Sequence, residues 1–230
     1  MRGDEADIAV LMPVLNEVAR IDRRLDELSA LGLTEVVVCD GGSTDATAEI
    51  AAAHDRVRVV TGRRCRGAQL RAAFEGTPAS VVLMLHADTQ LPGNAVGLIR
   101  SALADPGVVG GCFRLRFDND ALAFVLYSWF TRFETTFTTF GDQAFFARRA
   151  AIEAAGGIPD WPLFEDVELR RRLRRQGRFV KLAAEVTTSA RRFERQGVIR
   201  SQIRNALFVA GFWLGCSPQW LAARYRPEEH

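Results

Sequence analysis

Four short stretches of the sequence carry side chains suited to chemistry. Three of them, PVLNE (13–17), CDGGSTD (39–45) and HAD (86–88), follow apolar runs, and the fourth is FED (164–166). A carboxylate directly after a buried strand lies where that strand reaches the surface. Carboxylate oxygens bind hard divalent cations, and a carboxylate can also take a proton from a hydroxyl. The stretches therefore predict a polar site at the ends of several strands.

The elements that must position these residues alternate along the first half of the chain. Continuous apolar strands separated by helices favour a parallel sheet covered on both faces. In such sheets, ligands bind outside the carboxyl ends of the strands, which is where the first three stretches lie. The apolar patterns predict strands at 8–14, 35–39, 57–61 and 81–85, and helices at 17–31, after CDGGSTD, at 67–75 and from Pro92 to about 103.

The second half has a different pattern and is expected to form the other wall of one cleft. A longer strand is predicted at 108–117 and an aromatic-rich amphipathic helix at 119–133. A further helix is predicted in VELRRRLRRQG, and a closing helix from about residue 195. No repeat, linker or low-complexity tract separates the halves, so we expect one α/β domain over residues 1–230, with a mainly parallel central sheet flanked by helices.

Composition and charge agree with a single domain that binds anionic groups. The 230 residues are 48% hydrophobic and 25% charged, and residues 148–204 contain 14 basic and 7 acidic side chains. Lys181 is the only lysine, so nearly all positive charge is guanidinium, which binds phosphate or carboxylate oxygens as a fork. Genomic base composition is an alternative cause of the arginine bias. No known binding motif accompanies the charge, so we expect no nucleic-acid partner.

The cysteines and the apolar segments bear on location. Four cysteines are widely spaced without a zinc-like pattern, which favours reduced thiols in a cytoplasm. The N-terminus lacks a signal-peptide pattern, and the apolar segment 206–216 is too short to span a bilayer. We expect a cytoplasmic protein. The aromatic C-terminal tail either packs back onto the domain or makes a peripheral contact with a membrane surface.

Together, the four stretches resemble the family 2 glycosyltransferases of the GT-A fold, in order and spacing, from about residue 8 to about residue 205. The forms HADT, GDQ, FEDVEL and SARRFE are most similar to a small bacterial subgroup associated with arsenosugar biosynthesis and radical SAM partners. The resemblance implies a single Rossmann-like glycosyltransferase domain. Residues 1–105 would form the nucleotide-sugar-binding half, 106–205 the acceptor and catalytic half, and 206–230 a helical tail.

The resemblance implies a donor site on the first half. Glu17 and Asp40 would contact the base and the ribose, although Glu17 and Asp45 also suit helix N-termini electrostatically. Arg66 would contact the nucleotide or the diphosphate, with a solvated basic loop as the alternative. In the second half, a basic residue of SARRF would approach the diphosphate. The expected donor-binding residues are Pro13, Glu17, Asp40, Gly41, Arg66, Gln69, His86, Ala87, Arg191 and Arg192.

HAD occupies the place of the family's DxD motif. By that resemblance, Asp88 binds Mg²⁺ or Mn²⁺, which bridges the donor diphosphate. His86 departs from the usual aspartate. It either orients ribose or a metal-bound water, binds the metal directly, which would favour Mn²⁺, or is a core histidine with a satisfied hydrogen bond.

The resemblance makes Asp166 the general base that takes the proton of the acceptor, with Glu165 fixing the loop or touching the acceptor. The alternative is that FED is only an acidic first turn of the following helix. Gly141, Asp142 and Gln143 are assigned to the donor-sugar or acceptor side. The QxxRW motif of processive synthases is missing from the sequence, which favours transfer of a single sugar.

These inferences predict an inverting, non-processive, metal-dependent hexosyl- or pentosyltransferase. It would move one sugar from a nucleotide-diphosphate sugar, first of all a UDP-sugar, to a small-molecule or lipid acceptor. A catalytically silent nucleotide-sugar-binding protein and a sugar nucleotidyltransferase are the alternatives. A nucleotidyltransferase would be expected to carry a glycine-rich, basic loop where this chain has PVLNE. A glycosidase needs two carboxylates, but it needs neither DGGSTD at a strand end nor a diphosphate cation site.

Overall fold

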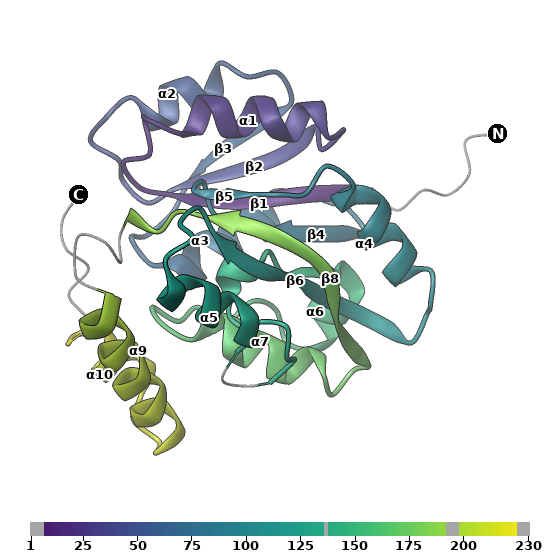
Figure 1. The fold of residues 1–230 in the computed structure, drawn as a ribbon. Coiled ribbons are helices and arrows are strands. Elements are labelled where there is room, and N and C mark those ends of the chain that lie inside the picture. Colours follow the sequence, from purple (N-terminus) through teal and green to yellow (C-terminus); the bar gives the residue numbers. More distant parts are fainter. Residues whose placement is uncertain (1–6, 136–137, 192–197, 225–230) are drawn as a thin grey trace.

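The structure is a computed structural model, and it describes residues 7–135, 138–191 and 198–224. Its centre is an eight-stranded sheet with the order β3-β2-β1-β4-β7-β6-β8-β5 (Figure 1). The strands are β1 (Ile8–Val14), β2 (Glu35–Asp40), β3 (Val57–Thr61), β4 (Val81–Met84), β5 (Thr89–Gln90), β6 (Val108–Phe117), β7 (Phe146–Arg148) and β8 (Arg178–Thr188).

The sheet is mainly parallel. β1 pairs in parallel with β2 and β4, β2 with β3, and β6 with β8. The short strand β7 runs antiparallel to both β4 and β6, and thereby joins the two halves of the sheet. β5 pairs antiparallel with the end of β8. The prediction of an α/β domain with a mainly parallel sheet is confirmed.

Helices cover both faces of the sheet, because side chains along each strand alternate between two cores. Val10 and Met12 of β1 belong to one core and Leu11 to the other. The first core is covered by α1 (Ile21–Ala30), α2 (Thr47–Ala52), α4 (Ala95–Leu103) and α5 (Leu122–Phe130). The second is covered by α3 (Arg66–Glu75), α6 (Arg149–Ala154) and α7 (Glu165–Leu173).

Two predicted helices differ from the structure. The first begins at Ile21 rather than at Glu17, because Asn16 has a φ of +53° and the next residues form a turn. Helix α5 was expected to be amphipathic, but Phe124 is its only buried residue. Its outer face is apolar, with exposed Leu122, Val125, Leu126, Trp129 and Phe130.

The last described elements are α9 (Val198–Trp213) and α10 (Pro218–Ala222), which lie to one side of the sheet (Figure 1). The ring of Phe212 in α9 stacks on that of Phe164, with a distance of 4.7 Å between the ring centroids. It also makes an edge-to-face contact with Trp161, with a centroid distance of 6.3 Å. The tail therefore contacts the loop that precedes α7. Among the described residues, no helix has both the length and the apolar character needed to cross a membrane.

Candidate active site

The ends of β1 and β2 carry two loops that are tied together by hydrogen bonds. Asn16 donates its backbone N–H to Ser43 Oγ at 2.9 Å and accepts the Thr44 N–H at 2.8 Å. Glu17 donates its backbone N–H to Thr47 Oγ1 at 2.8 Å. These bonds hold PVLNE and CDGGSTD as one polar edge (residues 13–18 and 40–47), which we call the donor edge after the role that the sequence resemblance led us to expect.

Asp40 lies at this edge with 8% of its surface exposed. Its carboxylate accepts the backbone N–H groups of Gly42 and Ser43, each at 3.1 Å, and the Ser43 hydroxyl at 2.5 Å. These bonds fix the carboxylate in a turn. Glu17, in the adjoining loop after the end of β1, forms an ion pair of 2.8 Å with Arg20.

Gln69 of α3 stabilises the donor edge through hydrogen bonds to the ends of β1 and β2. Its amide nitrogen donates to the backbone carbonyls of Val14 at 2.9 Å and Cys39 at 2.8 Å. Gly41 makes room for it, because a Cβ there would lie 2.9 Å from that nitrogen. Gln69 is buried, and the structure places it as a brace between two strand ends.

One pocket collects residues from both halves of the chain. It lies where β1 and β4 end, between α3 and α7. Its polar lining comes from Arg66, His86, Glu165 and Asp166, with Pro13 and Gly141 beside them. The rest of the lining is apolar: Leu70, Met84, Leu85, Phe145, Ile158 and Leu169. Predicted site residues from both halves of the sequence thus share one cavity.

Arg66 links the two halves of the pocket. It forms an ion pair with Glu165, and its guanidinium lies 3.5 Å from Asp166 Oδ2. Glu165 is 1% exposed, and burial raises the pKa of its carboxyl despite the neighbouring guanidinium. Burial alone would lower the pKa of Arg66, but the charges of Glu165 and Asp166 outweigh it and raise that pKa. Arg66 therefore carries a positive charge into the pocket.

The loop before α7 packs closely against the start of α3. The Gly67 N–H donates to the Trp161 carbonyl at 3.2 Å, and a Cβ on Gly67 would lie 2.4 Å from the Pro159 carbonyl oxygen. Only glycine permits this approach. Phe164 then takes a φ of +61° and turns the chain into α7, so that Glu165 and Asp166 begin the helix inside the pocket.

Asp166 is held by backbone donors. Its Oδ2 accepts the Gly141 N–H at 2.5 Å, and its Oδ1 accepts the Val167 N–H at 2.8 Å. A Cβ on Gly141 would lie 3.1 Å from the Asp166 Cβ, so the two residues are packed against each other. The FED segment is an acidic first turn, as the alternative supposed, and it is also part of the pocket.

Asp142 is a further carboxyl beside this site. Its Oδ1 is buried and has no hydrogen-bond partner within the part of the chain that the structure describes. Burial, with the nearby charge of Asp166, raises its pKa from 3.8 to about 6, although Arg66 opposes the shift. The pKa of Tyr127 is also raised, by burial first and then by the charges of Asp142 and Asp166.

Asp88 lies in the turn between β4 and β5. The Thr89 hydroxyl donates to Asp88 Oδ1 at 3.2 Å, and Arg24 of α1 donates to the Ala87 carbonyl at 3.0 Å. Among the described residues, no group of three or more His, Cys, Asp or Glu side chains is placed to hold a metal ion. One carboxylate fits a cation that takes its other ligands from a bound diphosphate and water, as Mg²⁺ commonly does.

Several predicted site residues do not line the pocket: Glu17, Asp40, Gly41, Gln69, Asp88 and Asp142, described above, and also Ala87, Gln143 and Arg191. The side chain of Ala87 is buried in the core. Gln143 is fully buried, and its amide bonds to Lys181 at 2.8 Å and to the Thr138 carbonyl at 2.7 Å, so it braces a loop. Arg191 is exposed, three residues beyond the Thr188 that pairs with Thr89. Arg192 lies outside the described residues.

Sequence reasoning missed Lys181 as a partner of the GDQ segment, Tyr127 as a half-buried phenol near the carboxylates, and Arg24 beside HAD. Lys181 had one visible signal, since it is the only lysine. Tyr127 and Arg24 belong to helices whose sequences carry no motif, and only the tertiary structure brings them to the site.

Solved structures with the same fold include several glycosyltransferases. The mannosyltransferase PcManGT from Pyrobaculum calidifontis, in complex with GDP-Man and Mn²⁺, aligns with a TM-score of 0.68 and 20% identity over 95% of this chain and 68% of that chain. Glucosyl-3-phosphoglycerate synthase from Mycobacterium tuberculosis, in complex with Mn²⁺, UDP and glucosyl-3-phosphoglycerate, aligns with a TM-score of 0.63 and 22% identity over 89% of this chain and 80% of that chain. At these identities the likeness establishes the fold.

Sequence comparison with protein families gives the affiliation of the chain. No curated protein matches it. The model of glycosyl transferase family 2 matches residues 9–153, which is more than half of the chain and covers the donor edge, HAD and GDQ. With the GT-A, Rossmann-like arrangement of the sheet, this match places the protein: the chain belongs to glycosyl transferase family 2.

Proposed function

We propose that the protein transfers one sugar from a nucleotide-diphosphate sugar to an acceptor hydroxyl, with inversion at the anomeric carbon. The observation that carries the proposal is the shared pocket, in which strand-end residues Pro13 and His86 face the Arg66–Glu165–Asp166 cluster. A transferase needs this juxtaposition, because donor and acceptor must meet at one carbon atom.

Asp166 is the base in this proposal. The acceptor oxygen forms a bond to the anomeric carbon as the bond to the diphosphate breaks, and Asp166 takes the hydroxyl proton. The N–H donors of Gly141 and Val167 support the role by fixing the direction of the carboxylate. Arg66 holds Glu165 and lies near Asp166, so its positive charge is available to a diphosphate oxygen.

Glu17 and Asp40 are the proposed contacts to the base and ribose, and Asp88 is the proposed metal ligand. A bound Mg²⁺ or Mn²⁺ would neutralise charge on the departing diphosphate. Structures of similar fold contain Mn²⁺ with GDP-Man or UDP-glucose, which supports both the cation and the donor class. We propose a UDP-sugar as the first donor to test, and either a hexosyl or a pentosyl group.

The acceptor is proposed to be a small molecule or a lipid. The forms HADT, GDQ, FEDVEL and SARRFE support the subgroup associated with arsenosugar biosynthesis and radical SAM partners. Exposed Trp213, Leu214 and Trp220 in the tail support a peripheral membrane contact for an otherwise cytoplasmic protein. Binding to vesicles of anionic lipid by the parent chain, and its loss in the variant Trp213→Ala/Leu214→Ala, would support that contact.

The proposal is tested first by donor binding. Calorimetry of UDP-, GDP-, CDP- and dTDP-sugars with and without Mn²⁺ should give metal-dependent binding of at least one donor. Asp88→Ala should remove the metal-dependent part of the affinity, whereas Asp120→Ala, an exposed carboxylate, should keep it. Metal-dependent binding unchanged in Asp88→Ala would refute the metal assignment.

A silent donor-binding protein and a sugar nucleotidyltransferase are the competing functions. Transfer or slow hydrolysis of the bound donor, with release of nucleoside diphosphate, supports the transferase. Release of pyrophosphate from a nucleoside triphosphate and a sugar phosphate would support the nucleotidyltransferase instead. Tight binding without any turnover would favour the silent protein.

A further inference from the structure

Residues 131–135 and 138–143 lie between α5 and β7 and end beside the proposed base, and we call these described residues loop 131–143. It runs from the end of α5 towards β7 and contains the turn Gly141–Gln143. Gly141 donates its N–H to Asp166, and Asp142 carries the buried carboxyl described above. The position of this loop therefore sets the surroundings of Asp166.

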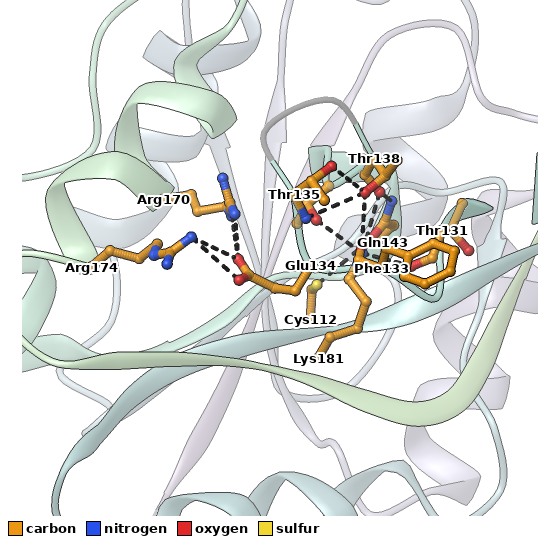
Figure 2. A network of polar contacts seen from close by, with 11 residues as sticks. Cys112, Thr131, Phe133, Glu134, Thr135, Thr138, Gln143, Arg170, Arg174 and Lys181 are labelled. Carbon is orange, nitrogen blue, oxygen red and sulfur yellow. Dashed lines mark hydrogen bonds and ion pairs between the residues drawn. The ribbon is translucent and has the colours of Figure 1, made fainter.

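The ammonium group of Lys181 lies inside the loop (Figure 2). Lys181 projects from β8, and five oxygen atoms of loop 131–143 surround its Nζ within 3.2 Å. They are the carbonyls of Thr131 (2.7 Å), Phe133 (3.1 Å) and Thr138 (3.2 Å), the Thr139 hydroxyl (2.9 Å) and the Gln143 amide oxygen (2.8 Å). One side chain thus binds the beginning and the end of the loop.

Two of these contacts flank the residue that touches the base. Thr139 and Gln143 lie two residues before and two residues after Gly141, and Lys181 binds both. The Gly141 N–H is thereby held from either side while it donates to Asp166 Oδ2. We propose, on the basis of the proposed transferase function, that Lys181 is a positioning residue for sugar transfer, which acts through loop 131–143 on Asp166.

The arrangement of the five oxygen atoms around Nζ suits a lysine at this position, in a chain with 30 lysine and arginine residues of which only one is a lysine. An ammonium is a compact charge with donors in three directions, and it suits oxygens that converge on one point. A guanidinium is planar, and its donors spread along a fork. Arginine would therefore spread its donors over a plane instead of placing them at the point where the five oxygens converge, despite its identical charge.

A second ion pair holds the same loop but does not flank Gly141. Glu134 is bound by Arg170 of α7 and, at 3.3 Å, by Arg174 (Figure 2). Glu134 lies seven residues before Gly141. This pair secures the first part of loop 131–143, so removal of Lys181 should free mainly residues 138–143.

The test uses Lys181→Ala, Lys181→Arg and the control Arg178→Met. Arg178 also lies on β8, where it forms an exposed pair with Asp105. Lys181→Ala should increase deuterium uptake of residues 138–143 and lower kcat about 10- to 100-fold, because small displacements in a catalytic site have effects of that size. The KM for the donor should change less than about threefold. Lys181→Arg should resemble the alanine variant, and Arg178→Met should resemble the parent.

Propylammonium supplies the atoms that Lys181→Ala removes. Its addition should restore both the deuterium uptake and kcat of Lys181→Ala and should leave the parent and Arg178→Met unchanged. If Lys181→Ala does not fold, Lys181→Met keeps the apolar stem and gives the same comparison of uptake and kcat.

Unchanged uptake at 138–143 in Lys181→Ala, or full kcat in Lys181→Arg, would overturn the proposal. If the parent transfers no sugar, the proposed function fails separately. The uptake of loop 131–143, with and without propylammonium, then still decides whether Lys181 fixes the loop.

Discussion

The donor edge is tied together by hydrogen bonds between its two short loops, whereas loop 131–143 and the start of α7 are held by charged side chains that are buried or half-buried. At the donor edge, Ser43 and Thr47 bond to the neighbouring loop, and these loops are readable as motifs. On the other side, Lys181, Arg66 and Glu165 lie far from their partners in sequence and meet them only in the folded chain. The two regions should therefore respond differently to substitution and to pH.

The largest expected effect comes from breaking the link between the halves. Arg66→Met would leave the Glu165 carboxylate, 1% exposed, without its ion-pair partner. A buried carboxylate that loses its ion-pair partner costs about 3 kcal/mol or more. Denaturant unfolding should show this loss. Arg63→Met, which breaks the exposed pair with Asp160, should lower the free energy of unfolding by less than about 1 kcal/mol. An equal loss in Arg66→Met and Arg63→Met would contradict the structural importance of the Arg66–Glu165 pair.

Gly67→Ala should push the two halves apart. Its Cβ would lie 2.4 Å from the Pro159 carbonyl oxygen, so the backbone must move, at a cost of about 2 kcal/mol. Gly97→Ala is the matched control, because Gly97 lies in α4 and a Cβ added there would meet no neighbouring side chain or strand within 4 Å. It should stabilise the protein by up to about 1 kcal/mol. Thermal unfolding measures the change in stability of both variants. A change of the same sign in Gly67→Ala and Gly97→Ala would refute the close packing of α3 against the loop before α7.

Asp142→Asn tests the buried charge by its pH dependence. The folded-state pKa of Asp142 is raised from 3.8 to about 6, by burial and by Asp166. The folded protein therefore binds an extra proton between those pH values, and the parent loses stability as the pH rises through about 6. Asp142→Asn should be more stable than the parent at pH 7.5, by about 2 to 3 kcal/mol, and the difference should nearly vanish near pH 4. A difference independent of pH would mean that Asp142 is not a buried charge.

The donor edge should give the smallest change. Thr47→Val removes the acceptor of the Glu17 N–H and should cost about 1 kcal/mol. Ser101→Ala, at an exposed position of α4, should change the free energy of unfolding by less than about 0.5 kcal/mol. The loss in Thr47→Val should persist from pH 6 to pH 8, unlike the effect of Asp142→Asn. A loss above about 3 kcal/mol would show that this edge depends on more than local hydrogen bonds.

The first half of the sequence predicted its elements closely because its signals are local. Continuous apolar runs indicated β1, β2, β3 and β4 almost to the residue, and Gly41 and Gly42 marked the turn after β2. The start of α1 was less predictable, because the bonds from Ser43 and Thr47 that hold residues 16–17 come from about 30 positions away. The short strand β5 exists only because Thr89 pairs with Thr188.

In the second half of the chain, the sequence indicated the motifs but not the contacts that their residues make. FED and GDQ were recognisable, but nothing in their spacing indicated that Gly141 donates to Asp166 or that Gln143 turns toward Lys181. The sequence predicts a donor contact or a solvated basic loop for Arg66, and the structure shows that it forms an ion pair with Glu165. Buried pairs between distant residues leave no periodic signal in the sequence, and this is why the charged side of the site required the structure.

The most direct test of the central claim is sugar transfer by Asp166→Asn, measured beside its binding of the donor. The claim is that both halves form one transferase site with Asp166 as the base. Asparagine keeps the shape and removes the proton acceptor, so donor affinity should stay within about threefold of the parent while transfer falls at least ~10²-fold. Normal transfer with reduced stability would contradict the claim and would leave Asp166 as a helix-terminal residue.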